Sequence, residues 1–104
     1  MKRTIERQMK RMVSKNLNSI SKTAKDIAKE WDAMTIPLST LKVIIDKSKP
    51  AKSKNSALDE FIINYNNTLD SLYKGCCDIA KKMNSKNIPL TQLNNGLSII
   101  KNAF

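Results

Sequence analysis

Apolar residues recur at alternating spacings of three and four along two long stretches of the chain. This spacing is typical of the a and d positions of packed helices, and it differs from the strict alternation of a half-buried strand. The pattern therefore predicts two long amphipathic helices, one in each half of the sequence. The two series are Val13, Leu17, Ile20, Ala24, Ile27, Trp31 and Met34, and Leu58, Ile62, Tyr65, Leu69, Leu72, Cys76, Ile79 and Met83.

A proline follows each long series, at Pro37 and at Pro89. We expect each long helix to end before it, because proline pushes the preceding residue out of the helical conformation. Each proline also suits the first position of a following helix, where its missing N–H costs nothing. The second long helix is expected to begin at Ser56 with a capping box that includes Asp59. Two shorter helices are predicted after the prolines, with apolar faces formed by Leu38, Leu41 and Ile45 and by Leu90, Leu93, Leu97, Ile100 and Phe104.

The chain matches itself when it is shifted by 52 residues, half of its length of 104. Over 17–41 the shift gives 11 identities in 25 positions without a gap. The identical blocks pair 26–29 with 78–81 and 36–38 with 88–90, and the second pair includes a proline. We interpret this match as a tandem duplication of a long-helix/short-helix hairpin.

A single hairpin would expose its apolar face to water, so we expect two hairpins to bury these faces against each other. The predicted fold is all-α, a four-helix bundle that forms one domain over 1–104. Its parts are a first hairpin, 1–46, a basic linker without apolar periodicity, 47–55, and a second hairpin, 56–104. A homodimer of single hairpins is the expected ancestor. The alternative is an extended pair of hairpins that closes on a partner or on a second copy of the chain.

Positive charge is concentrated in the first half of the chain. The formal net charge is +10; residues 1–54 hold 14 Lys/Arg and 5 Asp/Glu, whereas 55–104 hold 5 and 4. At 100° per residue, eight cations of the first long helix fall within about 140° of one another, opposite the apolar series, along roughly 39 Å. We call them the basic stripe: Arg3, Arg7, Lys10, Arg11, Lys15, Lys22, Lys25 and Lys29.

The basic stripe favours a polyanionic partner. Like charges four residues apart destabilise a helix, and a nucleic acid would turn this repulsion into attraction by counterion release. The predicted function is therefore a small non-enzymatic protein that binds the phosphate backbone of DNA or RNA with weak sequence specificity. Such a protein suits an accessory or packaging factor of a mobile element or virus. The linker supplies a second basic patch of Lys47, Lys49, Lys52 and Lys54.

Three other interpretations stay open. A lysine-rich face can serve solubility alone. A structural subunit of a virion would use both the basic and the apolar surfaces. A small helical module can also bind an acidic protein, as an inhibitor, an immunity protein or an adaptor. In that case Trp31 is the candidate anchor, since tryptophan is frequent among residues that dominate binding energy. The other role for Trp31 is packing in the core.

The composition argues against catalysis and against a bound cofactor or metal. The chain has no histidine and only two glycines, and its acidic residues do not pair at catalytic spacing. Cys76 falls at a core position and Cys77 one step around the helix, so we expect them to be a packed thiol and a partly exposed one. No apolar run exceeds three residues, which predicts no transmembrane segment. Reduced cysteines suit the cytoplasm or the inside of a virus particle.

Overall fold

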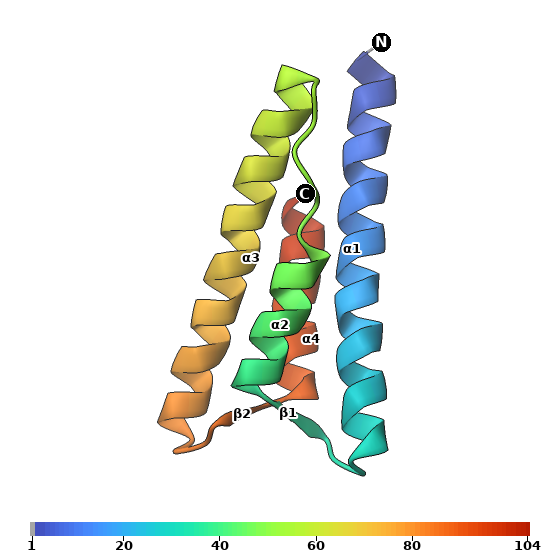
Figure 1. Cartoon of the computed structure of the whole chain (residues 1–104). Helices are drawn as coiled ribbons and strands as arrows, with labels where there is room; N and C mark the ends of the chain where they lie inside the picture. Colours follow the sequence, from blue (N-terminus) through green and yellow to red (C-terminus); the bar gives the residue numbers. More distant parts are fainter. Residues whose placement is uncertain (1) are drawn as a thin grey trace.

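The computed structural model describes residues 2–104, with side chains described from Thr4 onward. Four helices occur in the predicted order of long, short, long and short, so the helical prediction is confirmed (Figure 1). Two short strands, which the sequence did not predict, each join a long helix to the next short one. The elements are α1 (Lys2–Glu30), β1 (Thr35–Pro37), α2 (Leu38–Ser48), α3 (Ser56–Lys82), β2 (Asn87–Pro89) and α4 (Leu90–Ala103).

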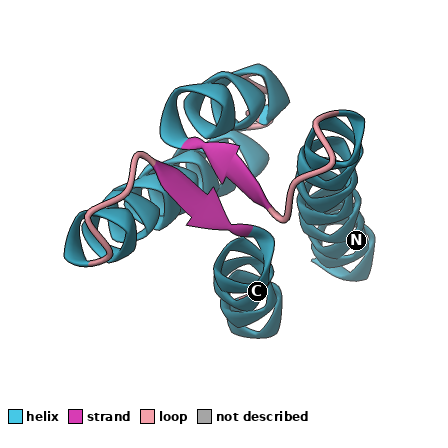
Figure 2. Cartoon of the chain, turned by 90° about the horizontal axis from the view of Figure 1, so that it is seen from below, coloured by secondary structure: helices cyan, strands magenta, loops and turns pink. Residues whose placement is uncertain are grey.

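The two long helices lie at opposite corners of the bundle, with α2 and α4 between them (Figure 2). Each of α1 and α3 packs against both short helices. The two strands pair across one end of the bundle, which we call the sheet end (Figure 2). The molecule measures 47 × 24 × 21 Å, because α1 and α3 extend beyond the short helices at the other end (Figure 1).

One core of aliphatic side chains joins all four helices and both strands. The predicted long series are buried from Val13 to Ala24 and, in α3, at Ile62, Tyr65, Leu69 and Cys76. Ile27, Leu72 and Ile79 pack against this core while partly exposed. The sequence analysis missed five buried residues, which are Ala28, Ile36, Ile44, Ala80 and Ile88.

The long helices end earlier than the prolines predict, and both end in the same way. Asp32 and Asn84 adopt left-handed backbone conformations with φ of 50° and 52°. The next N–H, of Ala33, donates to Ala28 O at 2.8 Å, and the N–H of Asp32 donates to Lys29 O at 3.1 Å. The same pair of bonds follows α3. These are Schellman motifs, which Asp and Asn tolerate at the left-handed position better than most residues.

The predicted core role of the last residues in each series is therefore wrong. Trp31 is 54% exposed, Met34 80% and Met83 54%. The helix has ended before these positions, so the helical period no longer turns them toward the core. The prediction for Trp31 as a surface residue is the one that agrees with its exposure.

The two strands pair antiparallel, with Ile36 opposite Ile88 and both side chains fully buried. Leu38 N–H donates to Lys86 O at 2.9 Å, and Leu90 N–H donates to Met34 O at 3.0 Å. The prolines take the N-cap position with extended ψ of 144° and 140°, not the first helical position. Bonded and non-bonded pairs alternate in such a ladder, so the prolines fall where no N–H is needed.

The linker begins later than predicted, after Ser48 rather than at Lys47. Helix α2 continues through Lys47 to Ser48, and Lys49 is extended, as expected before a proline. The N-cap of α3 is Asn55, not Ser56: its side chain accepts from Leu58 N–H at 3.1 Å. The carboxylate of Asp59 instead accepts from the N–H of Ser53, at 3.1 Å. The start of α3 is therefore capped by Asn55, one residue earlier than the predicted capping box, while Asp59 bonds to the linker.

Candidate nucleic-acid interface

The basic stripe lies on the outer face of α1, and we call it the α1 stripe from here on. Its seven described members, from Arg7 to Lys29, are all exposed, while the opposite face packs into the core. Between Arg7 and Lys29 the helix rises about 33 Å. Arg3, which the prediction includes, lies outside the residues whose side chains are described. The helix thus presents a straight row of cations along most of its length.

The described ion pairs of the molecule do not involve the α1 stripe. They join Lys42 and Lys49 to Asp46, and Lys49 to Asp70. The carboxylates of α1 itself, on Glu6, Asp26 and Glu30, form no ion pair with a described side chain of the stripe. The stripe cations are therefore available to an external anion without breaking an internal pair.

Helix α4 widens the basic face. Lys10 and Lys101 border one hollow of about 420 Å³ between α1 and α4. Farther along the same interface, Ser21 Oγ donates to Asn94 Oδ1 at 2.8 Å beside a hollow of about 230 Å³ that Lys101 also lines. Helix α4 contains no acidic residue. Lys101 therefore joins the stripe from a distant part of the sequence, and no sequence signal marks it as a member.

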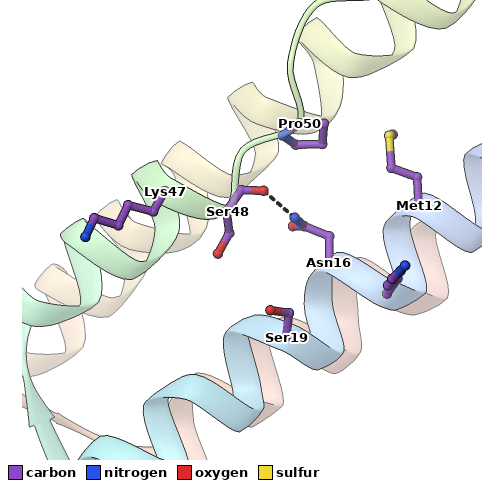
Figure 3. A pocket seen from close by; sticks show the side chains of 7 residues that line it. Met12, Asn16, Ser19, Lys47, Ser48 and Pro50 are labelled. Atoms are coloured by element: carbon purple, nitrogen blue, oxygen red, sulfur yellow. Dashed lines mark hydrogen bonds between the residues drawn. The ribbon is translucent and has the colours of Figure 1, made fainter.

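A further hollow, of about 390 Å³, lies between α1 and α2 (Figure 3). Lys15 borders it from α1 and Lys47 from α2. Its polar centre serves folding: Asn16 donates to Ser48 O and accepts from Tyr65 Oη at 2.6 Å. Because the Asn16 amide is committed to these two bonds, the hollow offers a ligand its bordering lysines rather than its centre.

The second predicted basic patch is divided by the fold. Lys47 stands on α2, while Lys52 and Lys54 are exposed in the linker. Lys49 binds Asp70 Oδ1 at 2.5 Å and Asp46 Oδ1 at 3.5 Å. The pKa of Lys49 is raised, chiefly by the hydrogen bond to Asp70. Burial lowers this pKa, and the negative charges of Asp70 and Asp46 raise it further. Lys49 is thus engaged within the protein, a pairing that sequence spacing of 21 residues does not reveal.

The cysteines lie as predicted, away from the stripe. Cys76 is buried and Cys77 half-buried, and neither forms a disulfide. Burial raises the pKa of Cys76 to about 11, with a smaller contribution from the neighbouring Cys77. Within residues 2–104, no group of three His, Cys, Asp or Glu side chains is placed to hold a metal ion. Nor is any described helix both long and apolar enough to cross a membrane.

Comparison with known proteins gives no relative from which to transfer a role. No protein-family model, curated protein or solved structure matches this chain.

Proposed function

We propose that this chain is a small non-enzymatic protein that binds nucleic acid through the phosphate backbone, with weak dependence on sequence. The observation that carries the proposal is the row of seven exposed cations on α1, none of which has an ion-pair partner among the described side chains. Lys101 and Lys47 extend it onto α4 and α2. Phosphate contacts of this kind fix a protein on the backbone but do not read bases.

The physical argument is the cost of the stripe to the free protein. Arg7, Arg11 and Lys15 follow one another at intervals of four residues, where like charges repel by a few tenths of a kcal/mol per pair. A nucleic acid removes this repulsion and releases counterions. A straight stripe of about 33 Å spans roughly ten base pairs of duplex. This length favours a duplex over a short flexible strand.

We also propose that the bundle arose by duplication of a 52-residue hairpin. Support comes from three correspondences at that offset: Asp32 with Asn84 in left-handed conformation, Leu38 with Leu90 in sheet bonding, and the order of the elements. In this account the core was kept and the surfaces diverged. The proposed setting is the cytoplasm or a virus particle, as an accessory or packaging factor.

The test is a binding titration with nucleic acid of arbitrary sequence. Labelled 30-base-pair DNA, the equivalent RNA duplex and a single strand are titrated with protein at about 50 mM salt, and anisotropy is recorded. Arg7→Glu with Arg11→Glu should weaken duplex binding more than 100-fold, since two contacts become repulsive. The matched control, Lys74→Glu with Lys82→Glu on α3, should change it less than threefold. Absence of binding by the unaltered protein, or equal loss in both variants, rejects the proposal.

A further inference from the structure

Exposed apolar side chains gather at the sheet end. Six large apolar side chains are exposed among the described residues; three of them, Trp31, Met34 and Met83, belong to the turns that follow α1 and α3. These turns lie on either side of the two-stranded sheet (Figure 2). The other three stand singly on α2, α3 and α4 as Val43, Ile63 and Ile99. Trp31 and Met34 therefore stand on one side of the sheet and Met83 on the other, and an occupant that contacts all three must lie across the sheet end.

The backbone that carries these side chains is held in place. Trp31 N–H donates to Ala28 O at 3.2 Å, and Met83 N–H donates to Ala80 O at 3.1 Å. Met34 O accepts from Leu90 N–H within the sheet hydrogen bonding. Side chains on an ordered backbone lose less conformational freedom when a partner binds, which favours their use as anchors.

The charge around the sheet end is positive. Lys29, Lys81, Lys82 and Lys86 are exposed there against Glu30 and Asp32, a net charge of +2. Two hollows combine these cations with apolar lining. One, of about 700 Å³, is lined in part by Leu38, Lys81 and Lys86. The other, of about 270 Å³, is lined by Lys25 and Lys29 together with Asp32, Met34 and Leu90. A complementary partner carries carboxylates together with apolar side chains. A second copy of the sheet end has the same net positive charge, so it would be repelled.

The sheet offers few backbone donors for strand addition. Pro37 and Pro89 have no N–H to offer to a third strand. The N–H of Asn87 is occupied by Ser85 Oγ at 3.0 Å. These features favour a partner that docks on the end of the bundle through side chains, as an amphipathic helix does, over one that extends the sheet.

We infer that the sheet end is a docking surface for an acidic amphipathic helix of another protein. Its apolar face would contact Trp31, Met34 and Met83, and its carboxylates would lie against Lys29, Lys81 and Lys86. This surface shares Lys25 and Lys29 with the stripe proposed to bind nucleic acid. The inference therefore stands apart from the proposed function, and each can fail without the other.

The test uses two synthetic helical peptides, one with glutamates and leucines at three- and four-residue spacing, the other with every leucine replaced by serine. Trp31 is the only tryptophan of the chain, so its fluorescence reports directly on the sheet end. The leucine peptide should shift Trp31 emission to shorter wavelength, and the serine peptide should bind at least tenfold more weakly. Equal binding of both peptides, or an unchanged emission, overturns the inference.

Variants locate the site by anisotropy of the labelled leucine peptide. Trp31→Ala should weaken binding about tenfold or more, as is usual for a central aromatic anchor. Ile99→Ala, an exposed apolar residue on α4, should leave it within twofold. Lys81→Glu with Lys86→Glu is a second variant that should weaken peptide binding, because these lysines lie against the partner's carboxylates. Arg7→Glu with Arg11→Glu should retain peptide binding. Duplex DNA that displaces the peptide equally well from the unaltered protein and from the Arg7→Glu with Arg11→Glu variant would assign this end to nucleic acid and overturn the inference.

Discussion

The two long helices hold the same place in the fold but present different surfaces. Helices α1 and α3 have 29 and 27 residues, bury corresponding residues such as Leu17 and Leu69, and end in the same backbone motif. On their sequences, however, α1 carries nine Lys/Arg and three Asp/Glu, whereas α3 carries three and four. Since α3 packs without a basic row, the charge of α1 is not required by its position in the bundle.

The comparison is tested first where the helices agree. Leu17 and Leu69 are corresponding core residues that are 2% and 0% exposed. Replacing either by Ala removes buried methyl groups and leaves a cavity, so each should cost about 2–5 kcal/mol of unfolding free energy. Urea denaturation followed by circular dichroism measures both. A cost below about 1 kcal/mol for either variant would show that its leucine does not hold the shared core position.

The adjacent cysteines sharpen the comparison, since they occupy the positions of Ala24 and Lys25 of α1. Burial raises the pKa of Cys76 to about 11, so its reactive thiolate should be about 100-fold scarcer than for an ordinary thiol. At pH 8, iodoacetamide should alkylate Cys77 first, and both cysteines only after unfolding. The raised pKa also means that this thiol's stabilisation is complete below pH 9 and lost between about pH 9 and 11. Mass spectrometry showing equal native labelling would contradict the burial of Cys76.

The Asn16 hydrogen bonds break the correspondence between the helices. Asn16 corresponds to Thr68, and its partner Tyr65 to Val13, so α3 has no equivalent network. Asn16→Ala leaves the buried Tyr65 hydroxyl without its acceptor and should cost about 1–3 kcal/mol. Thr68→Ala, which removes only a bond to Asn64 O within the helix, should cost less than about 0.5 kcal/mol. If Asn16→Ala and Thr68→Ala lower the stability equally in thermal unfolding, the Asn16 hydrogen bonds do not stabilise the fold as described.

The smallest expected effect is the difference in stability between Gly→Ala substitutions at two glycines on neighbouring helices. A Cβ at Gly75 of α3 meets nothing within 4 Å, so Gly75→Ala should stabilise the protein by roughly 0.5–1 kcal/mol. A Cβ at Gly96 of α4 would come within 2.4 Å of Leu72 Cδ1. Gly96→Ala should therefore gain less or destabilise, because Leu72 must move. Calorimetry measures the stability of both variants. A larger gain in stability for Gly96→Ala than for Gly75→Ala would contradict the packing of Gly96 against Leu72.

Apolar periodicity predicted what extends over many residues and missed what depends on single conformations. The long series identified α1, α3 and most of their buried residues. The strands were missed because three residues are too few to show a period of two. The early helix ends depend on Asp32 and Asn84 taking left-handed conformations, which these residue types permit but do not require.

The candidate interface divides in the same way. The helical period places the stripe members on one face of α1, and their exposure agrees with that placement. By contrast, the contribution of Lys101 and the pairing of Lys49 with Asp70 arise from contacts between elements. Such contacts depend on how the helices pack, which the pattern of a single chain segment does not encode.

The central claim is that the α1 stripe binds phosphates, and the salt dependence of duplex DNA binding tests it most directly. Each phosphate contact contributes about 0.9 to the slope of log affinity against log salt, so contact by four to seven stripe cations predicts roughly −4 to −6. Arg7→Gln with Arg11→Gln should reduce the slope by about 2, and Lys74→Gln with Lys82→Gln should leave it unchanged. A slope near zero, or an equal reduction by the α3 variant, would contradict the account.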